Sequence, residues 1–371
     1  MLIGSSIDDS LIAQPSAPLL TDLARLSTDK KHYLAKDDTA ILRRINSIIA
    51  AADKYLLLKP ASVMDKEFVP ASGSKHDYMS QAPYFWYDSS KPNGLPYMRR
   101  DGERNPEINR ITDRNNIGEL ENACSTLSLA WFFSSKESYA QKAAGLLRYW
   151  FFDTATKMNP NLNYAQGIPG VNTGRGIGII ETIALMGIAD ATLLLEGSSQ
   201  WTNTDQQALK QWYREYLHWM QTSANGKEEH VAKNNHGTWY LTQAIDFALF
   251  IKDMVTAKKM AEESKQLMEA QFDADGKQPL ELERTNALWY STYNLQAWLK
   301  LAMLAQKTGI DLWNHTNSKN AGIFKAIHWL EPYATGRQAF PYQQIDKYNK
   351  DVFYKLQQIA DSYRPGDIQK R

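Results

Sequence analysis

Residues 204–220 read TDQQALKQWYREYLHWM, and this stretch sets the expected fold. Its apolar residues recur every three or four positions, which places them on one face of an α-helix. These residues are Leu209, Trp212, Tyr213, Tyr216, Leu217 and Met220. Thr204 is followed three residues later by Gln207, which is typical of a capping box, so we expect the helix to begin there.

The same spacing recurs on both sides of this segment. Toward the N-terminus it involves Ile41, Ile45, Ile48, Ile49, Ala52 and Leu56. Further helices are expected near 118–134, 136–152, 179–195, 235–252, 254–271, 288–306 and 348–361. So many helices in series, without alternation of strands and helices, predict an all-α architecture of antiparallel helix pairs.

Composition excludes several classes of protein. The chain has 371 residues, with 42 Lys and Arg against 41 Asp and Glu, and this balance argues against a nucleic-acid partner. We expect no apolar run to approach the roughly 20 residues that a membrane span needs. The single cysteine, Cys124, excludes an internal disulfide and a cysteine-based zinc site, and its apolar surroundings indicate core packing.

Two segments, 59–116 and 153–178, interrupt the helical pattern. The first contains six prolines and many aromatic residues, and the second ends in Gly174-Arg175-Gly176. Long connections in a compact domain are usually functional or disordered, and a high aromatic content argues against disorder. We therefore expect both segments to form the walls of a site.

Two polar clusters each run into a predicted helix. The first is Asn234-Asn235-His236, and the second contains Arg284 and Tyr290. Each has a structural interpretation as well, because asparagine caps helices and charged clusters form surface ion pairs. Tyr290 lies six positions after Arg284, so the two would not share a face of one continuous helix. If both serve one site, Arg284 should precede the helix or lie in its first turn, with Tyr290 inside it.

An amide, a histidine, an arginine and a tyrosine suit elimination from a uronic acid. Hydrolysis of a glycoside normally needs two carboxylic acids, and neither loop offers an obvious pair. Elimination needs donors that stabilise charge on the substrate carboxylate, which Asn235 and His236 can supply. It also needs a group that takes the C5 proton and protonates O4. Tyr290 can do so if a neighbouring cation such as Arg284 lowers its pKa.

These residues belong to an ordered set of segments that resembles a known family. The segments are Ser74-Lys75-His76-Asp77-Tyr78, Asp101-Gly102-Glu103-Arg104-Asn105-Pro106-Glu107, Asn234-Asn235-His236, Glu283-Arg284-Thr285 and Tyr290-Ser291. Over about residues 60–330, they resemble the alginate lyase superfamily of polysaccharide lyases. The resemblance implies one catalytic domain over 1–371, folded as an incomplete (α/α) toroid or barrel with a cleft at one end. It also implies metal-independent elimination on uronate polymers.

The family pattern implies that Asn235 and His236 engage the carboxylate, whereas Arg284 and Tyr290 perform or support proton transfer. The sequence departs from the better-known members, because its tyrosine lies one residue closer to the arginine and is followed by serine instead of histidine. Tyr293 is therefore a competing candidate for proton transfer. The pattern is closer to a divergent branch that resembles polysaccharide lyase family 38, whose members act on alginate or glucuronan.

Further residues are candidates for substrate binding, by stacking on sugar faces or by pairing with carboxylates. They are Lys75, His76, Tyr78, Tyr84, Trp86, Tyr87, Arg99, Arg100, Arg175, Asn234 and Trp239. Each has a structural alternative, in the core of a loop, a solvated turn or an ion pair. The remaining histidines lack the spacing of a zinc helix, so no metal or cofactor is expected.

The leading hypothesis is a polysaccharide lyase that cleaves 1,4-linked uronate polymers, alginate first and glucuronan as the alternative. We expect a secreted or periplasmic monomer whose partner is an anionic polysaccharide, although Met1 to Pro15 shows no signal-peptide pattern. One rival is a glycoside hydrolase that uses Asp77, Asp101 or Glu283. Another is a carbohydrate-binding protein with a degenerate site. The sequence leaves open the uronate preference and the choice between endolytic and exolytic cleavage.

Overall fold

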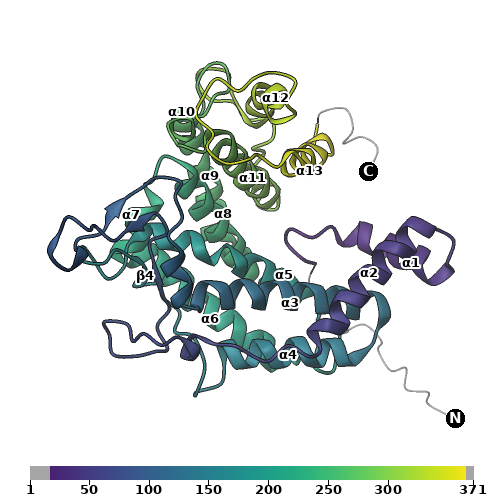
Figure 1. The fold of residues 1–371 in the computed structure, drawn as a ribbon. Helices are drawn as coiled ribbons and strands as arrows, with labels where there is room; N and C mark the ends of the chain where they lie inside the picture. The colour runs from purple at the N-terminus through teal and green to yellow at the C-terminus, as the bar shows by residue number, and fades with distance from the viewer. Residues whose placement is uncertain (1–16, 365–371) are drawn as a thin grey trace, which may run out of the picture.

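The computed structural model describes residues 17–364, and this part of the chain is mostly helical (Figure 1). The expected all-α fold is confirmed, whereas the expectation for Met1 to Pro15 concerns residues outside the described range. The α-helices are α1 (Leu23–Ala35), α2 (Thr39–Tyr55), α3 (Asp113–Ser134), α4 (Glu137–Phe151), α5 (Ala184–Leu194), α6 (Asn203–Thr222), α7 (Ala224–His230), α8 (Asn235–Phe250), α9 (Met254–Gln271), α10 (Pro279–Leu282), α11 (Ala287–Gln306), α12 (Ile323–Ala334) and α13 (Lys350–Asp361).

Each helix that the apolar spacing predicts is present, with ends that shift by a few residues. The helix expected near 179–195 begins instead as a 3-10 segment, η4 (Gly176–Ile183), which leads into α5. The spacing does not predict α1 or α12, nor the short helices α7 and α10. Only Asp29 is buried on α1, so no apolar stripe marks it. In α12, Pro332 interrupts an otherwise helical pattern.

The capping box of α6 lies two residues before its predicted position. The Thr202 hydroxyl oxygen accepts from the Asp205 N–H at 3.2 Å, and the Asp205 carboxylate accepts from the Thr202 N–H at 2.9 Å. The prediction that Thr204 and Gln207 form the box is wrong, because Asp205 both completes the box and pairs with Arg148 of α4 at 2.6 Å. The six apolar residues of this helix are all buried, as predicted.

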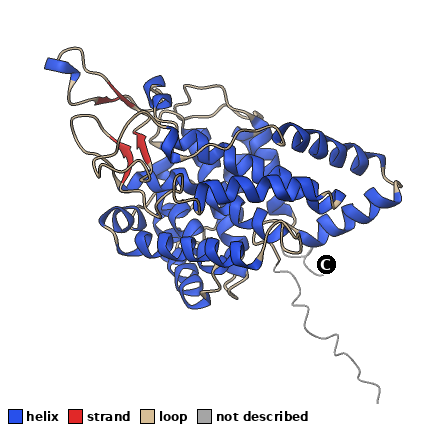
Figure 2. Cartoon of the chain, turned by 90° about the horizontal axis from the view of Figure 1, so that it is seen from below, coloured by secondary structure: helices blue, strands red, loops and turns tan. Residues whose placement is uncertain are grey.

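The helices form an open arc, and most alternate between an inner and an outer position (Figure 1). Helices α3, α5, α8 and α11 pack on one another in turn, whereas α4, α9 and α12 cover α3, α8 and α11. Helices α1 and α2 make a hairpin that projects from one end of the arc (Figures 1 and 2). Cys124 is fully buried on α3, which confirms its packing role.

The stretch Gly176–Leu194 is long and apolar enough, by length and composition, to cross a membrane, with a mean hydropathy of 1.8. The prediction that no apolar run approaches that length is therefore wrong for this stretch. However, 72% of it is buried inside the fold, where α5 packs against α3 and α8. Its apolar character is that of a core helix.

The two long segments meet on the side of the molecule opposite the α1–α2 hairpin, where the strands of the described chain lie (Figure 2). The first long segment ends where α3 begins, at Asp113, and not at the predicted residue 116. The segments contain strands β1 (Met79–Gln81), β2 (Phe85–Trp86), β3 (Met98–Arg99) and β4 (Tyr164–Gly167), and 3-10 helices η1 (Val63–Asp65), η2 (Pro92–Gly94) and η3 (Pro106–Arg110). Strands β1 and β4 pair in parallel, and β2 and β3 pair antiparallel. The β1–β4 pair therefore ties one segment to the other.

Candidate active site

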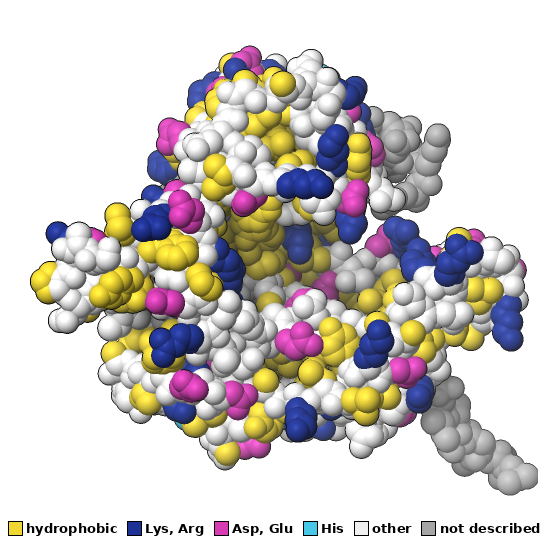
Figure 3. All heavy atoms as spheres, viewed as in Figure 1, with side chains coloured by type: hydrophobic (Ala, Val, Ile, Leu, Met, Phe, Trp, Pro, Cys, Tyr) yellow, Lys and Arg dark blue, Asp and Glu magenta, His cyan; other side chains and the backbone are white. Residues whose placement is uncertain are grey.

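A cleft lies where the two long segments meet the first turns of α3, α8 and α11. The face drawn in Figure 3 is hollowed between the part of the molecule that carries α11 and α12 and the part that carries α3 and α4. The cleft has a volume of about 480 Å³, which is typical of a ligand site. It is lined by Pro83, Tyr84, Phe85, Arg99, Arg104, Arg114, Gln166, Arg175, Ile177, Ile180, Asn234, Asn235, His236, Arg284, Trp289, Tyr290 and Tyr293. Five of these described residues are arginines, and none is an aspartate or glutamate. The lining is therefore suited to an anion.

Three consecutive residues at the start of α8 have different partners. Asn234 caps the helix, because its side chain accepts from the His236 N–H at 3.1 Å. The backbone N–H and the Nδ2 of Asn235 donate to the two oxygens of Glu281, at 2.6 and 2.8 Å. The Nδ1 of His236 lies 2.7 Å from Glu229 Oε1. The capping interpretation thus holds for Asn234 but does not account for the other two side chains.

Glu281 holds Asn235 in one orientation. The glutamate is 1% exposed on the short helix α10. Burial raises the pKa of Glu281, and the hydrogen bonds from Asn235 oppose that rise. The Oδ1 of Asn235 is buried and has no hydrogen-bond partner in the described part of the chain. Glu281 therefore fixes this amide through Nδ2, and the donor left for an anion is the second hydrogen of Nδ2, because Oδ1 can only accept a hydrogen bond.

Arg284 and Tyr290 have the arrangement that their spacing predicts. Arg284 precedes α11, and Tyr290 lies in the first turn of that helix. The guanidinium carbon of Arg284 is 3.7 Å from the centre of the Tyr290 ring. Asp101 holds the guanidinium with two hydrogen bonds, from Nη2 at 2.7 Å and from Nε at 3.1 Å. The cation is therefore fixed against the tyrosine ring.

Burial, rather than the neighbouring cation, dominates the acidity of Tyr290. Burial raises the pKa of its phenol well above the usual range, and Arg284 only partly opposes this. The prediction that Arg284 leaves this tyrosine with a lowered pKa is therefore wrong for the free cleft. The Tyr290 hydroxyl also lies 2.8 Å from the Tyr84 hydroxyl. The competing candidate, Tyr293, lines the same cleft and has its pKa raised by burial too.

Two cleft arginines, Arg104 and Arg175, take part in no ion pair among the described residues, and a third, Arg114, has only a long one. Arg104 takes part in no ion pair there, and Arg175 bonds only to the amide and carbonyl oxygens of Gln166. Arg114 lies 3.7 Å from Glu181, and its Nη1 is buried without a hydrogen-bond partner. Burial, and then a neighbouring arginine, lowers the pKa of both Arg104 and Arg175. An anionic ligand would relieve this crowding of positive charge.

The predicted substrate-binding residues divide into three groups. Those that line the cleft are Tyr84, Arg99, Arg175 and Asn234. Those in the long loops but outside the cleft lining are Lys75, His76, Trp86, Tyr87 and Arg100. Those buried behind it are Tyr78 and Trp239, at 0% and 3% exposure. This burial contradicts the prediction that Tyr78 and Trp239 contact the substrate.

The residues outside the cleft lining have structural partners instead. Tyr78 donates to Glu181 at 2.9 Å, and Trp239 packs against Tyr293 with ring centres 5.1 Å apart. The His76 ring bonds the Lys157 carbonyl at 2.7 Å and so connects the two long segments. Trp86 donates to the Glu103 carbonyl at 2.9 Å, and the Arg100 guanidinium lies 5.3 Å from the centre of the Trp86 ring. These side chains support the walls of the cleft.

Several cleft residues were not among the sequence candidates: Phe85, Arg104, Arg114, Gln166 and Trp289. Trp289 is 42% exposed, and its ring stacks on Tyr293 at 4.8 Å. Trp289 directly precedes Tyr290 in the sequence, so it could have been predicted as a cleft residue from its position next to the proposed proton-transfer group. Arg114 had no such signal, because it reaches the cleft only through the packing of α3.

The carboxylates that a hydrolase would use are occupied or lie elsewhere. Asp77 is buried and accepts hydrogen bonds from Asn159 and Asn161 at 2.8 and 3.1 Å. Asp101 is held by Arg284, and Glu283 is exposed outside the cleft. Within residues 17–364, no pair of free carboxylates lines the cleft, which disfavours the hydrolase rival.

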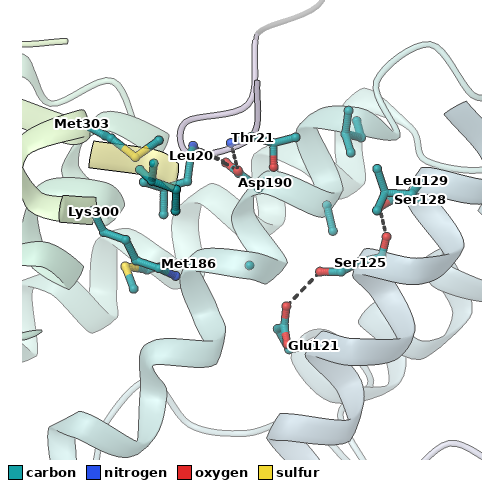
Figure 4. A pocket seen from close by; sticks show the side chains of 14 residues that line it. Leu20, Thr21, Glu121, Ser125, Ser128, Leu129, Met186, Asp190, Lys300 and Met303 are labelled. Carbon is teal, nitrogen blue, oxygen red and sulfur yellow. Dashed lines mark hydrogen bonds between the residues drawn. The ribbon is translucent and has the colours of Figure 1, made fainter. Parts of the chain in front are cut away.

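A second cavity, of about 280 Å³, lies further along α3 and α11 (Figure 4). Its charged lining residues are Glu121, Asp190 and Lys300. Asp190 accepts hydrogen bonds from the backbone N–H groups of Leu20 and Thr21, at 3.0 and 2.7 Å, which ties the start of the described chain to α5. The excess of carboxylates makes this cavity unsuited to an anionic polymer.

Replacing Asp101 with asparagine should weaken both stability and activity. Burial alone would raise the pKa of Asp101, but Arg284 and the Thr285 N–H overcome it and lower that pKa to about 2. Because this pKa is lower in the folded than in the unfolded protein, ionised Asp101 stabilises the fold at pH values above the unfolded pKa of 3.8. This stabilisation is lost as the pH falls through about 2. Asp101→Asn should therefore cost ~1 kcal/mol of unfolding free energy near neutral pH, because the pair is partly exposed. In urea unfolding, this cost should vanish as the pH falls from about 4 to about 2.

Asp205 supplies a matched control for this prediction. Arg148 lowers the pKa of Asp205 to about 2 as well, and Asp205 lies outside the cleft. Asp205→Asn should show the same pH-dependent loss of stability and keep its activity, whereas Asp101→Asn should lose activity because Arg284 is released. Equal activity in the two variants would contradict a role for Asp101 in holding Arg284.

Comparisons with known proteins identify the family of the chain. The family model "Alginate lyase" matches residues 62–340. An alginate lyase structure from Bacteroides ovatus is 38% identical, with a TM-score of 0.86 over 94% of this chain and 97% of that one. A tyrosine-to-phenylalanine variant of alginate lyase A1-III, complexed with a tetrasaccharide, is 16% identical, with a TM-score of 0.52 over 94% and 82%, and so supports the fold alone. That enzyme comes from Sphingomonas species A1. No curated protein matches the chain.

Proposed function

The chain belongs to the alginate lyase family and is a polysaccharide lyase, and from its cleft we propose how it cleaves a uronate polymer. The proposed reaction is β-elimination. A base removes the C5 proton, the C4–O4 bond breaks, a C4–C5 double bond forms, and O4 receives a proton. No water is consumed, so one product carries an unsaturated uronate at its new non-reducing end.

Asn235 and His236 are assigned to the uronate carboxylate. Negative charge grows on that carboxylate as the C5 proton leaves, and fixed donors in a cleft stabilise it without reorganising. Both residues are held from behind by buried glutamates, at 2.6 to 2.8 Å. This arrangement supports the assignment, because the two groups keep a fixed position while the charge develops.

Tyr290 is assigned to proton transfer, assisted by Arg284. The observation that carries this assignment is that the guanidinium carbon of Arg284 lies 3.7 Å from the centre of the Tyr290 ring. No carboxylate among the described residues lines the cleft around them. A cation favours the phenolate, which is the form that can take the C5 proton. Because burial raises the pKa of Tyr290, activity is expected to rise toward alkaline pH. Mass spectrometry tests the reaction, since products of elimination weigh one water less than products of hydrolysis.

The proposed substrate class is a polymer with carboxylates along its length, alginate first. Arginines bind carboxylates with paired hydrogen bonds, and Arg104 and Arg175 line the cleft without an ion-pair partner in the described chain, whereas Arg114 lies 3.7 Å from Glu181. Carboxylates are common to mannuronate, guluronate and glucuronate, so glucuronan stays in the test panel beside alginate.

Replacing Arg175 with alanine should weaken substrate binding more than turnover. A charge-assisted hydrogen bond contributes about 1.5–3 kcal/mol, so KM should rise by ~10–100-fold while kcat falls less. The difference between variant and wild type should shrink as salt is added. The matched control is Arg214→Ala, because Arg214 bonds to Gln211 on the exposed side of α6. An unchanged KM in the Arg175 variant would remove that arginine from substrate binding.

We also propose that the enzyme works outside the cytoplasm as a monomer. The support is the substrate, because a polymer meets such an enzyme outside the cell or in the periplasm. Fractionation of the producing cell, followed by size-exclusion chromatography with light scattering, tests both points. Activity confined to the cytoplasmic fraction would contradict the first, and a dimer mass would contradict the second.

A further inference from the structure

A buried glutamate stands directly behind the cleft histidine. Glu229, near the end of α7, is 2% exposed, and its Oε1 lies 2.7 Å from His236 Nδ1. The histidine itself lines the cleft. Because Nδ1 is bound on the protein side, Nε2 is the ring nitrogen left for a ligand.

An ionised glutamate can only accept a hydrogen bond, so the nitrogen that faces it carries a proton. We propose that Glu229 is a positioning residue that keeps a proton on His236 Nδ1 and directs Nε2 toward the uronate carboxylate. This inference rests on the function proposed above. It gives Glu229 a role in the reaction without contact to the substrate.

The choice of a carboxylate at this position is informative. A buried carboxylate close to an anionic substrate is unfavourable unless it is well paired. A glutamine could hold the ring at lower electrostatic cost, but it could also donate to Nδ1 and so would not specify which nitrogen is protonated. A carboxylate specifies it, and it forms an ion pair with a ring protonated on both nitrogens. That ring is the form whose Nε2 donates to a substrate carboxylate.

The chain contains a second histidine–glutamate pair outside the cleft. His230, the residue after Glu229, pairs through Nε2 with Glu263 of α9 at 2.9 Å. Its ring stacks on Tyr240, with ring centres 4.8 Å apart. The side chains of this outer pair are 33% and 31% exposed, against 14% and 2% for His236 and Glu229. Glu263→Gln is therefore a matched control for Glu229→Gln.

The kinetic test compares these two variants on the polymer that the wild-type enzyme cleaves. Glu229→Gln should lower kcat by ~10–100-fold, the range found when a partner that orients a functional histidine is removed, with little change in KM. Glu263→Gln should keep both constants. In a His236→Ala background, Glu229→Gln should cause no further loss, because Glu229 acts only through the histidine. Wild-type kcat in Glu229→Gln, or a full further loss in the double variant, would overturn the proposal.

A spectroscopic test is independent of turnover. Nitrogen-15 NMR of histidine-labelled protein distinguishes a protonated from an unprotonated Nδ1, and the His236→Ala variant assigns the signal. The wild-type spectrum should show a proton on His236 Nδ1, and this signature should change in Glu229→Gln but not in Glu263→Gln. An unprotonated Nδ1 in the wild type would overturn the proposal even if Glu229→Gln fails to fold. Absence of elimination by the wild type on every polymer would instead contradict the proposed function.

Discussion

A Tyr290→Phe variant is expected to lose at least ~1000-fold in kcat while it still binds polymer. The substitution removes only the hydroxyl oxygen, so the ring keeps its contact with Arg284 and its place in the first turn of α11. Positioned proton transfer contributes about 100- to 10,000-fold, and here one group would serve both the C5 proton and O4. Steady-state kinetics with an equilibrium binding measurement separates the two effects.

Tyr293→Phe is the comparison that assigns the proton-transfer role. Tyr293 lines the same cleft, but it lies three residues further along α11, and its ring packs between Trp289 and Trp239. Its variant should lose much less activity than the Tyr290 variant. The opposite order would transfer the role to Tyr293, and near-wild-type turnover in Tyr290→Phe would remove Tyr290 from the mechanism.

Arg284→Ala is expected to lower kcat by ~100-fold or more and to shift the pH dependence. The guanidinium is the main influence that lowers the pKa of Tyr290 against the effect of burial. Removal of the guanidinium should raise the pKa of Tyr290 further. The rising part of the pH–activity profile should therefore move to higher pH. The kcat and the pH profile of Arg284→Lys should lie between those of the wild type and of Arg284→Ala. Lysine keeps the charge but not the two hydrogen bonds to Asp101. A pH profile identical to the wild type would contradict this role.

Much of the fold was predictable because helix patterns are local. The spacing of apolar residues in 204–220 and its neighbours reports directly which face of each helix is buried. The relation of Arg284 to Tyr290 was predictable for the same reason, since a separation of six positions excludes a shared face of one continuous helix. The start of α6 was not, because Asp205 has a tertiary partner in Arg148 that the sequence does not reveal.

The cleft was only partly predictable, because its walls combine residues far apart in the chain. Aromatic content identified the long segments but did not distinguish cleft-lining residues, such as Tyr84, from buried supports, such as Tyr78. The supporting carboxylates were not identified as supports, because Glu229 and Glu281 gain their roles only when α7 and α10 pack beside the start of α8. Burial likewise decided the acidity of Tyr290, and burial is a property of the folded chain.

The most direct test of the account is ultraviolet absorbance of the unsaturated uronate during incubation with polymannuronate, polyguluronate, glucuronan and a pectic control. Each polymer is incubated with and without a chelator. We expect absorbance to rise on at least one of the first three polymers, whether or not the chelator is present, and that polymer identifies the substrate. New reducing ends without a rise in absorbance would establish hydrolysis and contradict the account. No product in either assay would instead favour a protein that binds the polymer without cleaving it.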